Sequence, residues 1–186
     1  MKSILVLFIF LSYNLEAQIK FVSASGNYTY TIPNSWKQAT KKELVEFAKS
    51  SGQTYDAILY PNIKSNFDGP PILLSIFKRK DFNPSEYEPF AKDLLKNLKT
   101  DFSQYLPAQY ADIVKNMKPG HAFYDKKSSC FSYSYDSEIK GVAKTFNIIT
   151  GFFTPKGIII LQYSAYSKNY TNTIDSYIKL VSSLKK

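Results

Sequence analysis

The feature that most constrains the fold is a run of strand-like sequence between residues 111 and 166. Within it, residues 130–135 alternate small and aromatic side chains, which is the two-residue period of a strand. Segments 142–153 and 158–166 are apolar and rich in β-branched residues, and Pro155-Lys156-Gly157 between them is typical of a hairpin turn. Because hairpins place neighbouring strands antiparallel, the sequence predicts an antiparallel sheet.

Helical periodicity lies on both sides of this run. From Pro89 to Leu106, apolar residues recur every three or four positions, and lysines occupy the opposite face. A second helix is predicted over residues 169–184, where one apolar stripe contains Tyr170, Ile174, Tyr177, Ile178, Val181 and Leu184. Each amphipathic helix must bury its apolar face against another element. The sequence therefore predicts an α+β domain in which helices cover the antiparallel sheet.

The first part of the chain adds shorter elements. Residues 28–32 alternate apolar and polar side chains, which predicts a strand, and Trp36 is expected to anchor the core. Thr40-Lys41-Lys42-Glu43 has the spacing of a capping box and predicts the start of a short helix. The residues expected to face inward from that helix are Leu44, Phe47 and Ala48. Two further strands are predicted over residues 55–60 and 72–78.

Two segments of the chain resemble a known family. Tyr28-Thr29-Tyr30-Thr31-Ile32-Pro33-Asn34-Ser35-Trp36 is similar to the strand-Pro-x-x-Trp opening of the Mog1/PsbP-like family. The close is similar too, with Leu161-Gln162-Tyr163-Ser164-Ala165 followed by a helix that ends at Val181-Ser182-Ser183-Leu184-Lys185. The resemblance implies an αβα sandwich and an accessory or binding role rather than catalysis. Members of the family range from photosystem II assembly to small-GTPase binding, so the resemblance bears on the fold alone.

The first residues predict export. Lys2 precedes an unbroken apolar run from Ile4 to Leu11, and a polar stretch ending at Ala17 follows, as in a secretory signal peptide. The run is far shorter than the ~20 residues that a membrane span needs. The alternative is that this N-terminal apolar segment forms a buried strand of the fold. We expect a signal peptide over residues 1–17, a single domain over residues 18–186, no membrane span in the mature chain, and a periplasmic or secreted protein that is soluble after signal-peptide removal.

Net charge limits the class of partner. The chain carries 24 Lys+Arg against 15 Asp+Glu, a formal net charge of +9, but Arg79 is the single arginine. Arginine supplies the planar, two-pronged contacts to phosphate and guanine that specific nucleic-acid binders use. The lysines are spread along the sequence, which is typical of a solvated surface, with a weak attraction to anionic surfaces as the alternative. We therefore expect no specific nucleic acid among the partners.

The candidate catalytic and metal-binding residues are few. His121 is the single histidine, and Asp125 is the carboxylate that could orient it, yet no nucleophile motif accompanies them. Cys130 is the single cysteine and is expected to be a structural thiol, with activation by nearby lysines as the alternative. Asp136 and Glu138 share one face of a strand. Two carboxylates are too few ligands for a calcium site, so both side chains are expected to be solvated. No catalytic residue, cofactor or metal ligand is predicted.

Tyrosine is unusually common, with 15 residues against a single tryptophan. Tyrosines suit half-buried strands, and on an exposed face they also form recognition surfaces. Packing is the expected role for most of them. The tyrosines that flank predicted loops form a candidate recognition surface that comprises Tyr55, Tyr60, Tyr105, Tyr110 and Tyr166.

The predicted function follows from these points together. We expect an exported, non-enzymatic binding or accessory domain that acts on a protein or an envelope component. The alternative is a secreted hydrolase whose carboxylate-based site is assembled only in the fold. A structural envelope component is a third class.

Overall fold

The structure is a computed structural model that describes most of the chain after the predicted leader. The described residues are 19–22, 28–34, 36–52, 54–61, 72–77, 83–100, 114–139, 143–155, 157–167, 171 and 173–186. The predicted signal peptide, residues 1–17, lies outside them.

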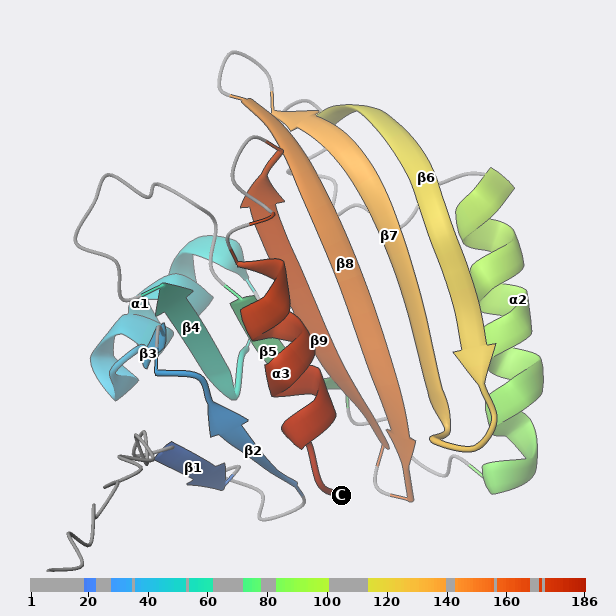
Figure 1. Cartoon of the computed structure of the whole chain (residues 1–186), viewed down its shortest axis with the longest axis horizontal. Coiled ribbons are helices and arrows are strands. Elements are labelled where there is room, and N and C mark those ends of the chain that lie inside the picture. The colour runs from blue at the N-terminus through green and yellow to red at the C-terminus, as the bar shows by residue number, and fades with distance from the viewer. Residues whose placement is uncertain are drawn as a thin grey trace, which may run out of the picture.

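A seven-stranded sheet forms the centre of the molecule (Figure 1). Every neighbouring pair in it is antiparallel, as the sequence predicts. Across the sheet the strands follow the order β3 (Trp36–Gln38), β4 (Ala57–Pro61), β5 (Ile72–Phe77), β9 (Gly157–Tyr166), β8 (Ala143–Thr154), β7 (Cys130–Ile139) and β6 (Val114–Asp125). A second, two-stranded sheet pairs β1 (Ile19–Val22) with β2 (Thr29–Ile32). The long strands β6 to β9 are consecutive hairpins, and Thr154 pairs with Gly157 at the predicted turn.

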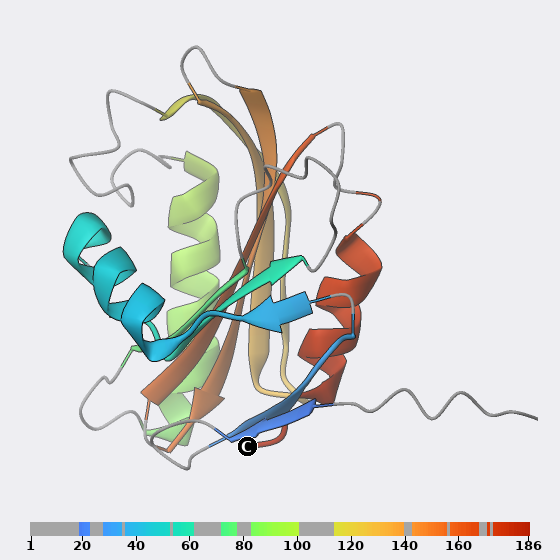
Figure 2. The same ribbon diagram turned by 90° about the vertical axis from the view of Figure 1, so that its left-hand side faces the viewer.

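Helices cover both faces of the large sheet. Figure 2 shows α2 (Tyr87–Thr100) on one side and α3 (Ile174–Ser183) on the other. The third helix, α1 (Lys41–Ser51), lies on the same side as α2. The architecture is the predicted α+β, αβα sandwich.

The core under α3 is built from alternate residues of the long strands. From β9, Ile159, Leu161 and Tyr163 face this helix and are almost fully buried, together with Tyr177 and Leu180 of α3 itself. The Tyr177 hydroxyl donates to Thr150 Oγ1 over 2.8 Å, so the buried hydroxyl is paired. Trp36 belongs to the same core at 5% exposure, as predicted, and so do the apolar residues of 28–32.

The core under α2 is aromatic. Phe131 and Phe153 face this helix, and the ring of Tyr87 stacks on Phe153 with centroids 4.6 Å apart. Phe131 lies opposite Gly151 in the β7–β8 pairing, and its ring fills the space that a side chain at position 151 would occupy. These contacts dock α2 on the sheet.

The helix ends differ from the predicted ones. Helix α2 begins two residues before Pro89, because a short 3-10 turn, η1 (Pro84–Glu86), leads directly into it. Its described part ends at Thr100, and the rest of the predicted segment lies outside the described residues. Helix α3 begins at Ile174, five residues after the predicted start.

One residue of the predicted stripe on α3 was assigned to the wrong face. Ile178 is 53% exposed, whereas Leu180 is fully buried. Position 178 lies about 100° around the helix from Tyr177, which faces the sheet, so Ile178 falls beyond the contact. The sequence alone does not show which margin of an apolar stripe is buried, so it does not decide whether an aliphatic side chain at one margin is covered.

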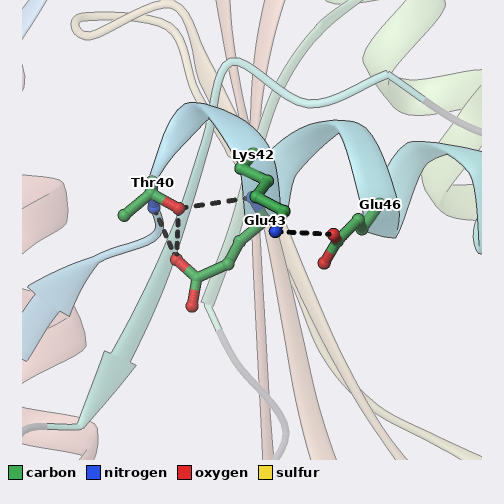
Figure 3. A network of polar contacts seen from close by, with 4 residues as sticks. All are labelled: Thr40, Lys42, Glu43 and Glu46. Atoms are coloured by element: carbon green, nitrogen blue, oxygen red, sulfur yellow. Dashed lines mark hydrogen bonds and ion pairs between the residues drawn. The ribbon is translucent and has the colours of Figure 1, made fainter.

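The start of α1 is the predicted capping box (Figure 3). The backbone N–H of Thr40 donates to Glu43 Oε2 over 2.7 Å, and the backbone N–H of Glu43 donates to Thr40 Oγ1 over 3.3 Å. The backbone N–H and the hydroxyl of Thr40 both donate to Glu43 Oε2, and these two hydrogen bonds lower the pKa of Glu43. One turn later, Lys42 and Glu46 approach within 4.0 Å. The residues predicted to face inward, Leu44, Phe47 and Ala48, are only half-buried, so this helix packs less closely than α2 or α3.

Candidate functional site

An open groove runs between α2 and β6, the strand that ends the sheet opposite β3 in the described part of the chain. Its volume is about 580 Å³. Helix α2 lies beside β6 (Figure 1) and forms one wall of the groove. The residues that line it are Glu88, Lys92, Leu95 and Lys96 of α2, Ala122, Phe123 and Tyr124 of β6, and Lys126 of the following turn. We refer to this feature as the α2–β6 groove.

Helical and strand periodicity together produce this lining. Glu88, Lys92 and Lys96 are spaced four residues apart, so they share one face of α2. The adjacent stripe contains Tyr87, Ala91 and Leu95 and packs on the aromatic core. On β6, Ala122 and Tyr124 pack against that same core. The groove is therefore the margin where the helix–sheet contact meets solvent.

The charges of the groove are partly paired. Lys92 Nζ lies 2.8 Å from Glu88 Oε1, and Lys126 Nζ lies 3.3 Å from Glu88 Oε2. The two lysines lower the pKa of Glu88, and Glu88 raises the pKa of Lys92. Lys96 adds a third cation, so three lysines and one glutamate leave a formal charge of +2. The rim of the groove is therefore positive.

An exposed aromatic residue adjoins this positive rim. Phe123 is 56% exposed, although its neighbours on β6 pack inward. Successive strand residues point to opposite faces, so the side chain of Phe123 points to the face away from α2, although the residue itself borders the groove. Aromatic residues are enriched at interaction surfaces, whose rims are polar and accessible to solvent, so Phe123 beside this rim marks a candidate contact surface.

The structure does not bring His121 and Asp125 together as a catalytic pair. His121 lies exposed on β6, and its backbone N–H donates to Ser134 Oγ over 3.1 Å. The Asp125 carboxylate accepts from the backbone N–H groups of Lys127 and Ser128, at 3.1 and 3.2 Å. The Ser128 hydroxyl also donates to this carboxylate, and its hydrogen bond, followed by those from the backbone, lowers the pKa of Asp125 and gives it a role in the β6–β7 turn.

The other two carboxylates that the sequence singled out lie in a cross-strand charge pattern. Asp136 is opposite Lys118 in the β6–β7 register, and Glu138 is opposite Lys144 in the β7–β8 register. Opposite charges facing one another across strands stabilise a sheet. Among the described residues, no group of three His, Cys, Asp or Glu side chains could hold a metal ion.

Cys130 is placed as a structural thiol. It is 7% exposed, and burial raises its pKa to about 11. Because the thiolate is the reactive form, this thiol is protonated at neutral pH and is a poor nucleophile.

A buried polar cluster on β7, β8 and β9 is satisfied by its own members. The Asn147 amide donates to Ser137 Oγ and Thr145 Oγ1, over 3.1 Å in each case, and its carbonyl oxygen accepts from Ser164. Paired groups of this kind hold strands in register rather than bind a ligand.

The candidate recognition tyrosines are placed apart from the groove. Tyr55 precedes β4 with its ring against Phe47, at a centroid distance of 5.4 Å. Tyr60 lies on β4 and Tyr166 at the end of β9, both half-buried. Tyr105 and Tyr110 lie outside the described residues. The three described tyrosines are not among the residues that line the α2–β6 groove.

Comparison with known proteins identifies the fold. No protein-family model and no curated protein sequence matches the chain. Among solved structures, PsbP of the cyanobacterium Synechocystis sp. PCC 6803 (CyanoP) superposes with a TM-score of 0.58 at 11% identity, covering 94% of this chain and 95% of that one. The chain has a Mog1/PsbP-like fold.

Two further structures are similar. LpqN of Mycobacterium tuberculosis, described as involved in cell envelope biogenesis, matches this Mog1/PsbP-like chain with a TM-score of 0.51 at 14% identity, covering 85% of this chain and 82% of LpqN. The Saccharomyces cerevisiae Ran-binding protein Mog1p matches with a TM-score of 0.48 at 7% identity, covering 90% and 94%. At these identities the likeness concerns the fold. Within the described segments, no helix is long and apolar enough to cross a membrane.

The sequence pattern did not reveal the groove. Lys92 and Lys96 were expected on the solvated face of their helix, which is correct, but Lys126 follows them by 30 residues or more in the chain. Their convergence depends on β6 being the outermost strand beside α2. The available signal was a phenylalanine on a polar strand, Phe123, followed closely by Lys126.

Proposed function

We propose that this protein is an exported, non-enzymatic binding or accessory domain that acts on a protein or an envelope component. The observation that carries the proposal is the α2–β6 groove, with an apolar floor, a lysine rim and the exposed Phe123 beside it. A shallow surface of this kind fits a macromolecule better than it fits a small substrate, which would be enclosed by a deep pocket.

Site-specific photo-crosslinking tests this proposal. A photoreactive phenylalanine analogue replaces Phe123 in the full-length protein expressed in its own host. The matched control places the analogue at Val45, which is 54% exposed on α1, at the other end of the molecule (Figure 1). The proposal expects one saturable adduct at Phe123 that the control position does not form. Equal labelling at both positions would reject the groove as the binding site.

A second measurement addresses the affinity of the captured component. Purified partner should bind the wild type and the Lys49→Glu variant alike, because Lys49 is an exposed residue of α1. The Lys96→Glu variant reverses one charge on the rim and should weaken binding about tenfold. Equal affinities for the two variants would contradict a role for the rim.

The export part of the proposal concerns residues 1–17 as a signal peptide and residues 18–186 as the mature domain. A chain with this leader should be processed at or near Gln18 and recovered outside the cytoplasm. The intact mass of the exported protein gives the cleavage site directly. Recovery of the full chain in the membrane fraction would contradict it.

The tyrosines remain a proposed second contact surface. Tyr55, Tyr60 and Tyr166 are each half-buried, so replacing one by alanine should weaken partner binding if it contributes. Stability measured beside affinity separates lost packing from lost contact. Turnover of any substrate that disappears in His121→Ala, Asp136→Asn or Glu138→Gln would instead favour the hydrolase alternative.

A further inference from the structure

Strand β6 is the last strand of the large sheet. In the described part of the chain its paired neighbour is β7, and the sheet order ends at β6. In an antiparallel strand, alternate backbone N–H and C=O groups point away from the paired neighbour. An outermost strand therefore presents a row of donors and acceptors to which another strand can add.

The two halves of β6 differ in how well they could accept a strand. The first half has register shifts between Lys115 and Lys118 and between Pro119 and Ala122. Such irregularities, lysine side chains and proline are the features with which proteins block unwanted strand pairing. The second half, from Ala122 to Asp125, pairs with β7 in an uninterrupted register. The regular half is thus the part of the edge without those obstacles.

The same regular half borders the α2–β6 groove. Ala122, Phe123 and Tyr124 line the groove, and Lys126 follows at the end of the strand. Lys92 and Lys96 lie across it on α2, one helical turn apart, which is a rise of about 6 Å. Alternate residues of an extended strand are about 6.8 Å apart. Two carboxylates on one face of an added strand therefore match the spacing of these lysines.

We propose that the α2–β6 groove binds an extended, acidic segment of a partner protein, which adds to β6 alongside Ala122–Asp125. Alternate side chains of that segment carry carboxylates toward the lysine rim, and those between them are apolar and lie beside Phe123. Main-chain hydrogen bonds supply affinity in this mode, while the alternating side chains supply specificity. The inference rests on the proposed function, since it names the class of partner that the groove takes.

Glu88 has a defined part in this arrangement. Its carboxylate lies between Lys92 and Lys126 and occupies the positions that a partner carboxylate would approach. Replacing Glu88 by glutamine raises the formal charge of the groove from +2 to +3. An acidic segment should then bind about threefold more tightly at low salt, and high salt should remove most of the gain.

The test uses purified, isotope-labelled protein and defined peptides in an NMR titration. The probe is a seven-residue peptide that alternates glutamate and valine, with the corresponding lysine–valine peptide as the charge control. A third peptide has the probe's sequence with N-methyl groups on alternate residues, which removes strand hydrogen bonds and keeps the charge. We expect the largest shift changes at the amides of Ala122–Asp125. We expect binding weakened about tenfold by N-methylation and about tenfold by Lys96→Glu, with Lys49→Glu within about twofold of wild type.

Three results would overturn the inference. The first is that the probe leaves the NMR shifts of the β6 amides unchanged. The second is that the N-methylated peptide binds as tightly as the probe. The third is that the lysine–valine peptide binds as tightly as the glutamate–valine peptide. If any of these occurs while cross-linking at Phe123 still captures a partner, strand addition of an acidic segment is wrong and the binding function stands. Absence of the Phe123 adduct instead rejects the binding site itself.

Discussion

Replacing Gly151 by alanine should destabilise the protein through a single steric conflict. Gly151 lies on β8 opposite Phe131, whose ring covers it. A Cβ at position 151 would overlap the Cζ and Cε1 atoms of Phe131 and lie 3.0 Å from its Cε2. Phe131 has little room to move, because it is 2% exposed and its ring centroid is 5.6 Å from that of Phe153.

The expected magnitude combines two opposing effects. Overpacking a core costs about 1–3 kcal/mol, whereas replacing glycine by alanine within a strand otherwise stabilises by about 0.5–1 kcal/mol. Since the overlap is with a confined ring, the upper half of the overpacking range applies, and the net loss in the free energy of unfolding should be about 1–2 kcal/mol. In urea melts at an unchanged m-value of about 2 kcal/mol/M, the midpoint should fall by about 0.5–1 M.

A double-mutant cycle isolates the steric cause. Phe131→Ala alone should cost about 3–5 kcal/mol, because it leaves a cavity under α2. In that background the conflict is absent, so adding Gly151→Ala should stabilise by about 0.5 kcal/mol. The reasoning is refuted if Gly151→Ala is neutral in the wild type, or if it costs the same in both backgrounds.

The remaining predictions concern helices and buried ionisable groups. Thr40→Ala should lower stability by about 1 kcal/mol in urea melts, because it removes the capping box at α1; an unchanged midpoint would show that the cap contributes nothing. Leu98→Ala should cost about 2–5 kcal/mol, since Leu98 is 3% exposed on α2, and a loss below about 0.5 kcal/mol would contradict its burial. Burial raises the pKa of Cys130 from 9.0 to about 11 and that of Tyr135 from 10.0 to about 12, so the folded state holds these protons longer than the unfolded state. The stability that these two groups contribute should be fully present below about pH 9, and the part from Cys130 should be lost as the pH rises through about 11. Urea midpoints across this range should therefore decline less steeply in Cys130→Ala than in the wild type. Parallel declines would refute the assignment to this thiol.

Several elements could be predicted because their signals are local in sequence. The capping box needs only the spacing of Thr40 and Glu43, and the hairpin turn after Thr154 needs only its own three residues. The alternation of residues 28–32 likewise identified the buried face of β2. In each case the interacting groups lie within a few positions of one another, so propensity and periodicity suffice.

The candidate site could not be predicted because it depends on which strand is outermost. Strand pairing places β9 beside β5, more than 80 positions away in sequence, and leaves β6 at the end of the sheet. No periodic pattern in the sequence of β6 indicates that it lies at the end of the sheet. The same limit explains Ile178, since only the docking of α3 on the sheet shows which margin of its apolar stripe is buried.

Amide hydrogen exchange in the complex with the component captured at Phe123 tests the central claim most directly. The claim is that the α2–β6 groove is the binding surface. The account predicts slowed exchange over Ala122–Asp125 and over the Lys92–Lys96 turn of α2, with α1 unchanged as the internal control. Slowed exchange confined to α1 or α3, with β6 and α2 unchanged, would contradict it.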